Sequence, residues 1–210
     1  PSPSLIAPQS RPLRSLFLAH YVHQPHVKTR KVAVLGFRAV GKSSLTIRFI
    51  DDVFIQAYNP TIEATFNKTF DVDGSHYHLE VADTAGQDDY SILHSQYALG
   101  IHGYILVYSV ASKNSFETLK IIRDKILNVT GAATIPCVLV GNKSDLQFER
   151  QVPREQGQAL ADSWGCAFVE SSAKHNERVE DIFKLIIREI EKTTQHYDMP
   201  AESGCCCTIM

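Results

Sequence analysis

The sequence predicts an α/β fold with a six-stranded, mostly parallel sheet, one antiparallel strand and helices on both faces. Short apolar runs rich in β-branched residues alternate along residues 31–190 with segments whose apolar residues recur every three or four positions. Such alternation is typical of βα units, because two parallel strands need a crossover segment, usually a helix. In addition, the turn Asp73-Gly74 between two strand-like runs predicts a hairpin, and therefore one antiparallel strand.

The first half of the chain supplies three of the predicted strands and one helix. Residues 31–35 are a lysine followed by four apolar residues, and this run is predicted to form a buried strand. A helix is predicted at residues 43–50. Residues 64–72 and 76–82 are the two strands that the turn joins.

The second half of the chain contains three strands and three helices. The predicted strands are residues 103–109, 137–140 and 167–170, and the predicted helices are residues 114–129, a segment that starts near Pro153, and a final helix. The final helix has the clearest pattern, with apolar residues at spacings of three and four: Val179, Ile182, Phe183, Ile186 and Ile190. Because parallel sheets bind ligands beyond the carboxyl ends of their strands, we expect the functional site there.

Composition divides the chain into a disordered N-terminal extension at 1–29, a folded domain at 30–192 and a flexible tether at 193–210. Residues 1–30 hold five of the nine prolines and no glycine, which is typical of disorder. Two alternatives are an organelle transit peptide, since the segment lacks acids, and a metal site at His20, His23 and His26. We favour a solvated tail, whose four Lys and Arg are too few to predict a nucleic-acid partner.

Hydropathy and cysteine usage exclude other classes of protein. No apolar run approaches the roughly 18 residues of a membrane-spanning helix, so an integral membrane protein is not expected. Cys137 and Cys166 stand singly in apolar segments, and the other three cysteines are adjacent at residues 205–207. This is neither a disulfide framework nor a zinc-binding spacing, and it predicts a reduced, cytosolic protein.

A phosphate-binding loop follows the first predicted strand. Residues 36–43 read Gly-Phe-Arg-Ala-Val-Gly-Lys-Ser, a full match to G-x-x-x-x-G-K-S between a strand and a helix. In such a loop successive backbone N–H groups and the helix N-terminus face the phosphates, while Lys42 supplies a positive charge and Ser43 a hydroxyl ligand for Mg²⁺. The candidate phosphate-binding residues are Arg38, Ala39, Val40, Gly41, Lys42, Ser43 and Ser44.

Two further motifs select the base. Asn142-Lys143-Ser144-Asp145 follows the strand at 137–140, so that the Asp145 carboxylate can accept hydrogen bonds from the ring N–H and the exocyclic amine of guanine. Adenine lacks both donors and would leave a buried carboxylate unpaired. The backbone of Ser172-Ala173-Lys174 can donate to the guanine oxygen. A P-loop kinase or ATPase is therefore disfavoured.

The residues after the third predicted strand are suited to hydrolysis. Asp83 can hold a metal-bound water, the backbone N–H of Gly86 can reach a γ-phosphate, and the Gln87 amide can orient the attacking water. The Thr61 hydroxyl can complete the Mg²⁺ shell. The predicted catalytic residues are thus Lys42, Thr61 and Gln87, and the predicted metal ligands are Ser43, Thr61 and Asp83. A segment held only through Mg²⁺ and the γ-phosphate is released on hydrolysis.

These motifs, in this order from Arg30 to Lys192, resemble the Ras superfamily of small GTPases. Residues 36–47, 58–66, 83–92 and 103–110 are most similar to the Ras relatives associated with TOR-kinase signalling. The resemblance implies a monomeric, Mg²⁺-dependent GTP/GDP switch with slow hydrolysis and a TOR-type kinase complex as effector. It also implies that Phe54 packs edge-on against the base, that Lys143 and Lys174 flank it, and that Tyr58 closes over the phosphates.

Arg38 departs from the glycine that most Ras relatives have at this position. We expect its side chain to point toward the γ-phosphate, which predicts slow hydrolysis, a high GTP-bound fraction and an activating protein without the usual arginine finger. The resemblance suggests a tuberin-type activator that supplies asparagine instead. Two alternatives are a solvated Arg38 outside the loop and a largely GTP-bound adaptor whose hydrolysis is not needed for signalling.

The chain closes on a predicted lipid anchor. Cys207-Thr208-Ile209-Met210 is a C-a-a-X sequence whose terminal Met favours farnesylation of Cys207. One lipid chain binds membranes only marginally, and residues 193–206 contain no Lys or Arg, so a polybasic second signal is absent. Cys205 and Cys206 are either palmitoylation sites or free thiols. The expected location is the cytoplasmic face of a membrane.

Overall fold

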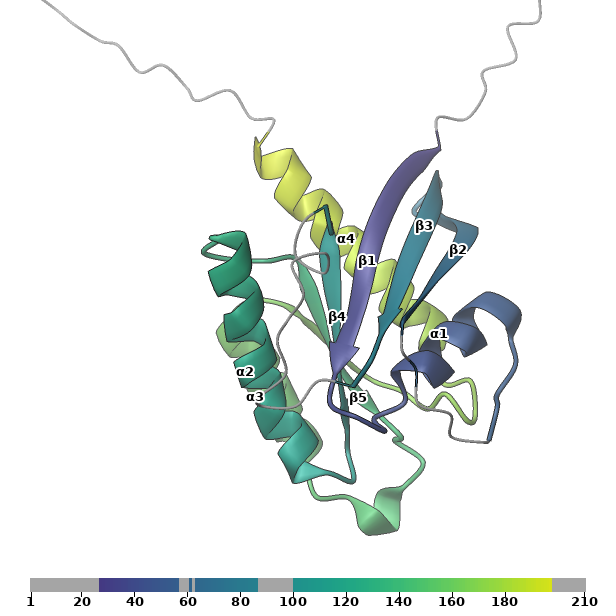
Figure 1. Cartoon of the computed structure of the whole chain (residues 1–210), viewed down its shortest axis with the longest axis vertical. Coiled ribbons are helices and arrows are strands. Elements are labelled where there is room, and N and C mark those ends of the chain that lie inside the picture. The colour runs from purple at the N-terminus through teal and green to yellow at the C-terminus, as the bar shows by residue number, and fades with distance from the viewer. Residues whose placement is uncertain (1–26, 57–60, 62, 87–99, 198–210) are drawn as a thin grey trace, which may run out of the picture.

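The computed structural model describes residues 27–56, 61, 63–86 and 100–197 (Figure 1). Within them one six-stranded sheet has the order β2-β3-β1-β4-β5-β6, and every neighbouring pair is parallel except β2 with β3. The predicted α/β fold, with one antiparallel strand, is confirmed. The strands are β1 (Lys28–Gly36), β2 (Glu63–Val72), β3 (Ser75–Thr84), β4 (Gly103–Ser109), β5 (Cys137–Asn142) and β6 (Ala167–Glu170).

The hairpin between β2 and β3 forms at the predicted turn. Asp73 and Gly74 both have positive φ, at 50° and 79°, and Val72 pairs directly with Ser75. A two-residue loop with positive φ at both positions matches the right-handed twist of the flanking strands. The turn therefore fixes the register of the one antiparallel pair.

Two helices cover each face of the sheet (Figure 1). On one face α1 (Lys42–Asp51) packs on β1, β2 and β3, and α4 (Val179–Tyr197) packs on β4, β5 and β6. On the other, α2 (Lys113–Thr130) packs on β1 and β4, and α3 (Arg154–Trp164) packs on β5 and β6. A short 3₁₀ helix, η2 (Gln147–Glu149), precedes α3. All four predicted helices are confirmed.

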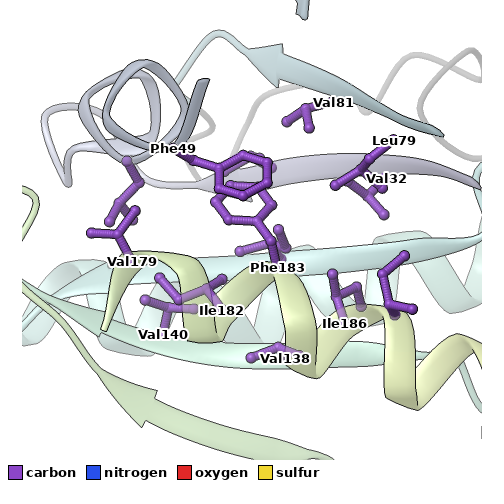
Figure 2. Packing of buried hydrophobic residues seen from close by; sticks show 14 of the residues in the cluster. Val32, Phe49, Leu79, Val81, Val138, Val140, Val179, Ile182, Phe183 and Ile186 are labelled. Carbon is purple, nitrogen blue, oxygen red and sulfur yellow. The ribbon is translucent and has the colours of Figure 1, made fainter. Parts of the chain in front are cut away.

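The apolar face of α4 closes the core between the sheet and α1. Figure 2 shows Phe183 of α4 against Phe49 of α1, and their ring centroids lie 3.7 Å apart with the planes at 12°. Phe70 of β2 meets Phe49 edge-on at 5.3 Å. The apolar positions predicted for this helix, from Val179 to Ile190, are all buried. This packing holds α1, which follows the phosphate loop, against the sheet.

The start of β1 and the end of α4 meet at one end of the domain. Glu191 accepts from Lys28 at 3.0 Å and from Arg30 at 2.7 Å and 3.0 Å. In Figure 1 this end lies opposite the loop that joins β1 to α1. β1 begins three residues before the predicted strand, and α4 continues to Tyr197.

Several predicted features lie outside the described residues. They are the histidines at 20, 23 and 26, Tyr58, Gln87, and the cysteines at 205–207. In the part of the chain that the structure does describe, no helix combines the length and the apolar character that a membrane span requires.

Candidate functional site

Two glycines allow the loop between β1 and α1 to lie close to neighbouring strands. A Cβ on Gly36 would lie 2.1 Å from the carbonyl oxygen of Val107 in β4. A Cβ on Gly41, where φ is 95°, would lie 2.3 Å from Nδ2 of Asn142 at the end of β5. Real Cβ contacts are never this short, so both positions require glycine. The G-x-x-x-x-G spacing thus brings the loop against the carboxyl ends of β4 and β5.

Lys42 is a buried cation at the bottom of this loop. It is 5% exposed, and its Nζ donates to the carbonyl oxygens of Gly36 and Phe37 at 3.2 Å and 3.1 Å. Burial lowers the pKa of Lys42 to about 8, against the opposing effect of the Asp83 carboxylate. An anion bound next to this amine would stabilise its charged form, and a phosphate group is such an anion.

Three oxygen-bearing side chains meet beside Lys42. Ser43 Oγ lies 2.7 Å from Thr61 Oγ1, and Ser43 is also a hydrogen-bond partner of Asp83. Asp83 is buried at the end of β3, and its Oδ1 has no hydrogen-bond partner among the described residues. Burial raises the pKa of Asp83, while the Ser43 hydrogen bond and the Lys42 charge lower it. Hard oxygen donors and an unpaired carboxylate oxygen fit Mg²⁺.

At the other end of the site, Asn142 and Asp145 hold three loops together. Asn142 donates from Nδ2 to the carbonyl oxygen of Val40 at 2.8 Å, and its Oδ1 accepts from the Ala173 N–H at 3.4 Å. Asp145 accepts from the Ser172 hydroxyl at 2.6 Å. The loops after β1, β5 and β6 are therefore held in fixed relation, as recognition of one planar base requires.

A cavity of about 580 Å³ runs between the two ends. The predicted residues that line it are Arg38, Ala39, Gly41, Lys42, Ser43, Ser44, Phe54, Thr61, Gly86, Asn142, Lys143, Asp145, Ala173 and Lys174. Val40 and Ser172 are buried, and they hold the lining residues Asn142 and Asp145 through hydrogen bonds. A nucleotide is elongated, with a charged and a planar end, and this cavity has matching ends.

Four lining residues were missed from sequence: Ile47, Ile55, Gln56 and Thr84. Ile47 could have been found, because it lies four residues after Ser43 and three after Ser44 on the same helix face. Thr84 was detectable only as the neighbour of Asp83. Ile55 and Gln56 follow Phe54 in a segment without regular structure, and no periodicity marks them.

Arg48 of α1 is a further residue that no motif indicated. Its guanidinium donates to the carbonyl oxygens of Ala173 at 3.0 Å and Lys174 at 3.3 Å, and to that of Asp52 at 2.7 Å. Its Cζ also lies 6.0 Å from the centroid of the Phe54 ring. One side chain thus contacts both the loop after β6 and the aromatic residue Phe54, which line the same cavity.

The Arg38 side chain lies over its neighbour Phe37 and is exposed, with Cζ 5.3 Å from the ring centroid. Its backbone is close to Gly86, where an added Cβ would lie 2.5 Å from the Arg38 Cα. This position matches the alternative of a solvated arginine, although the residue also lines the cavity.

A family model described as the Ras family matches residues 31–192. The chain belongs to the Ras family. It is 54% identical over 183 residues to the GTP-binding protein rhb1 of Schizosaccharomyces pombe, covering 87% of this chain and 98% of the relative. It is 55% identical over 168 residues to the GTP-binding protein Rheb of Homo sapiens, covering 80% and 91%.

The predicted resemblance to Ras proteins is confirmed, and the chain is a Rheb-like small GTPase. A Rheb homolog of Dictyostelium discoideum, 53% identical over 178 residues, covers 85% of this chain and 96% of its own length. Ras-family GTPases hydrolyse GTP, use Mg²⁺, and work with effectors and regulators. These requirements agree with the buried cation and the three oxygen donors of the cavity.

Replacing Arg48 with Ala is expected to speed GDP release by about tenfold. The change removes hydrogen bonds from a charged donor to the loop after β6, and each of these contributes about 1.5–3 kcal/mol. Part of this free energy stabilises the loop in the nucleotide-bound form, so its loss speeds GDP release. The release of a fluorescent GDP analogue in excess unlabelled GDP measures the rate. Arg188→Ala is the matched control, since Arg188 pairs with Asp73 far from the cavity. Equal rates of GDP release for Arg48→Ala and wild type would show that Arg48 does not help to retain the nucleotide.

Proposed function

We propose that the cavity binds GTP or GDP with the phosphates over Lys42 and the guanine beside Asp145. The observation that carries this proposal is the cavity itself, which joins a buried amine at one end to a carboxylate at the other. Phe54, Lys143 and Lys174 also line the cavity, which supports the roles that the family resemblance implies for them at the base. Residues 30–192 would form the nucleotide-binding unit, 1–29 an extension and 193–210 a tether.

In the proposed reaction, charge that spreads over the γ-phosphate oxygens is stabilised by Lys42 and by backbone N–H groups of residues 38–43. Gln87 orients the attacking water, and the Gly86 N–H faces the γ-phosphate. Ser43, Thr61 and Asp83 would hold Mg²⁺, which supplies positive charge to the phosphate oxygens. Burial of Asp83 supports this assignment, because its unpaired oxygen needs a cation.

The same contacts make the nucleotide a switch. Thr61 and Gly86 belong to two different segments, and both line the phosphate end of the cavity. Loss of the γ-phosphate would remove the group that both segments contact, so that each is released on hydrolysis. We therefore assign signalling to the segments around Thr61 and Gln87.

The effector and the activating protein are assigned by similarity to Rheb proteins. That similarity supports a TOR-type kinase complex as the effector and a tuberin-type activator that supplies asparagine. Arg38 lines the cavity with an exposed side chain that lies over Phe37, so a role for it in excluding an arginine finger is supported by the family resemblance alone. With such an activator, Gln87 contributes less to catalysis than in other Ras relatives.

We assign membrane attachment to a farnesyl group on Cys207. The last turn of α4 lies at the end of the domain opposite the loop after β1 (Figure 1), so a lipid beyond α4 leaves the cavity accessible. Attachment at the cytoplasmic face of an endomembrane or plasma membrane agrees with a nucleotide switch of this kind. Palmitoylation of Cys205 or Cys206 would supply the second signal that stable residence needs.

Asp145→Asn is expected to weaken GDP binding at least about tenfold and to improve binding of xanthosine diphosphate. An amide cannot accept from both guanine donors, whereas it can donate to the additional carbonyl of xanthine. Titration calorimetry with both nucleotides measures the exchange of specificity. Glu149→Gln is the control, because this exposed carboxylate lies in η2 nearby. Co-purification of an adenine nucleotide with the wild type would contradict the proposal.

Arg38→Gly is expected to raise the single-turnover rate of GTP hydrolysis by about tenfold, or about 1.4 kcal/mol in the barrier. The proposed reason is that glycine removes a large side chain from the lining of the cavity, so that water and an arginine finger meet less obstruction. The rate is measured with and without an activating protein, using Arg188→Ala as control. Unchanged rates in both conditions would remove any role for Arg38. A wild type without activator-stimulated turnover would favour the GTP-bound adaptor.

Cys207→Ser is expected to move most of the protein from the membrane fraction to the soluble fraction of cells. Without the farnesyl group the free energy of burying its carbon atoms, about 0.8 kcal/mol per CH₂, is lost. Fractionation followed by immunoblotting measures the distribution, with Cys166→Ser as a cysteine control inside the domain. An unchanged membrane fraction for Cys207→Ser would show the lipid assignment to be wrong.

A further inference from the structure

Two cysteines that the nucleotide site does not use lie side by side at the far end of the sheet. Cys137 is the first residue of β5, and Cys166 directly precedes β6. The parallel register pairs Val138 with Ala167, so Cys137 and Cys166, which directly precede these two residues, lie opposite each other. Adjacent strands are about 4.7–4.9 Å apart, and disulfides form at Cα separations of about 4.4–6.8 Å. Each thiol also shifts the pKa of the other, as expected of two neighbouring sulfur atoms.

The two thiols differ in environment. Cys137 is 2% exposed, whereas Cys166 is only half-buried. The interaction with Cys137 lowers the pKa of Cys166, and it raises that of Cys137, whose burial acts in the same direction. Cys166 is therefore the better nucleophile and the accessible one, while Cys137 stays protonated behind it.

Arg123 of α2 provides an independent observation at the same place. Its Nε is buried and has no hydrogen-bond partner in the described part of the chain. Its charge favours the thiolate at both cysteines, while Glu189 of α4 opposes that effect. The guanidinium is held over Trp164, with Cζ 5.0 Å from the ring centroid. A buried donor without a partner, whose charge acts on both thiols, is suited to a negative charge that forms on sulfur.

We propose that Cys166 and Cys137 form a hydroperoxide-reactive dithiol that closes to a disulfide between β5 and β6. The Cys166 thiolate attacks a peroxide oxygen, forming an S–O bond as the O–O bond breaks, and the departing oxygen takes a proton to leave as water or an alcohol. Cys137 then attacks the resulting sulfenic acid. The S–S bond forms, the S–O bond breaks, and hydroxide leaves as water with the Cys137 proton. The dithiol loses two electrons to the peroxide.

This modification lies beyond the nucleotide switch and uses none of its residues. The strands that the disulfide would connect carry Asn142 and the Ser172-Ala173-Lys174 loop at or just beyond their other ends. The disulfide would therefore connect, at one end, the two strands whose other ends carry the proposed base-binding residues. A dithiol reductant reverses the modification.

The test treats the full, GDP-loaded chain with hydrogen peroxide, blocks free thiols by alkylation and digests with trypsin. We expect a disulfide between the peptides 126–143 and 155–174, which contain Cys137 and Cys166. The link should disappear after reduction, and should not form selectively when the chain is oxidised in urea. If both thiols remain alkylatable while the cysteines at 205–207 are oxidised, the proposal is wrong.

Variants separate the two roles. Cys137→Ser should leave a sulfenic acid on Cys166 that dimedone captures, whereas Cys166→Ser should leave Cys137 unmodified. Arg123→Ala should slow oxidation of Cys166 by about tenfold, with partial recovery in Arg123→Lys, because either cation favours the thiolate. Circular dichroism shows whether each variant is folded. Equal rates for Arg123→Ala and wild type would overturn the role of Arg123, and capture of Cys137 instead of Cys166 would overturn the assigned order.

Discussion

The site depends on two hydrogen bonds of the Asn142 carboxamide. It is buried at the end of β5, donates to the phosphate loop at Val40 and accepts from Ala173 in the loop after β6. Gly41 makes this contact possible, because any side chain there would occupy the position of the amide nitrogen. Loops that are distant in sequence thus acquire one geometry, and the two ends of the cavity are kept at a fixed separation.

Two buried charged groups, Lys42 and Asp83, determine which kind of ligand the phosphate end of the cavity prefers. Lys42 and Asp83 are both buried, and burial acts against the charged form of each. Neither is fully compensated within the described residues, since Lys42 donates only to neutral carbonyls and one Asp83 oxygen has no partner. An anion and a cation bound together would satisfy both groups. This is why a phosphate with a divalent ion suits the site better than either alone.

The features that were predicted correctly from the sequence are those that depend on residues close together in the chain. The loop spacing, the Asp73-Gly74 turn and the three-and-four pattern of α4 each lie within one short segment, and all three form as expected. Arg48 was missed because its partners, Ala173 and Lys174, are more than a hundred residues away. The Cys137–Cys166 pairing depends in the same way on the register of β5 with β6. Such contacts depend on tertiary placement, which periodicity does not contain.

The position of Glu191 has a mechanical consequence. A force on the C-terminal end of the chain enters the domain through the last turns of α4, where Glu191 binds Lys28 and Arg30 at the beginning of β1. β1 lies between β3 and β4 within the sheet, so the load passes into the interior of the sheet. The loops around the cavity lie at the other end of the strands and are not in this path.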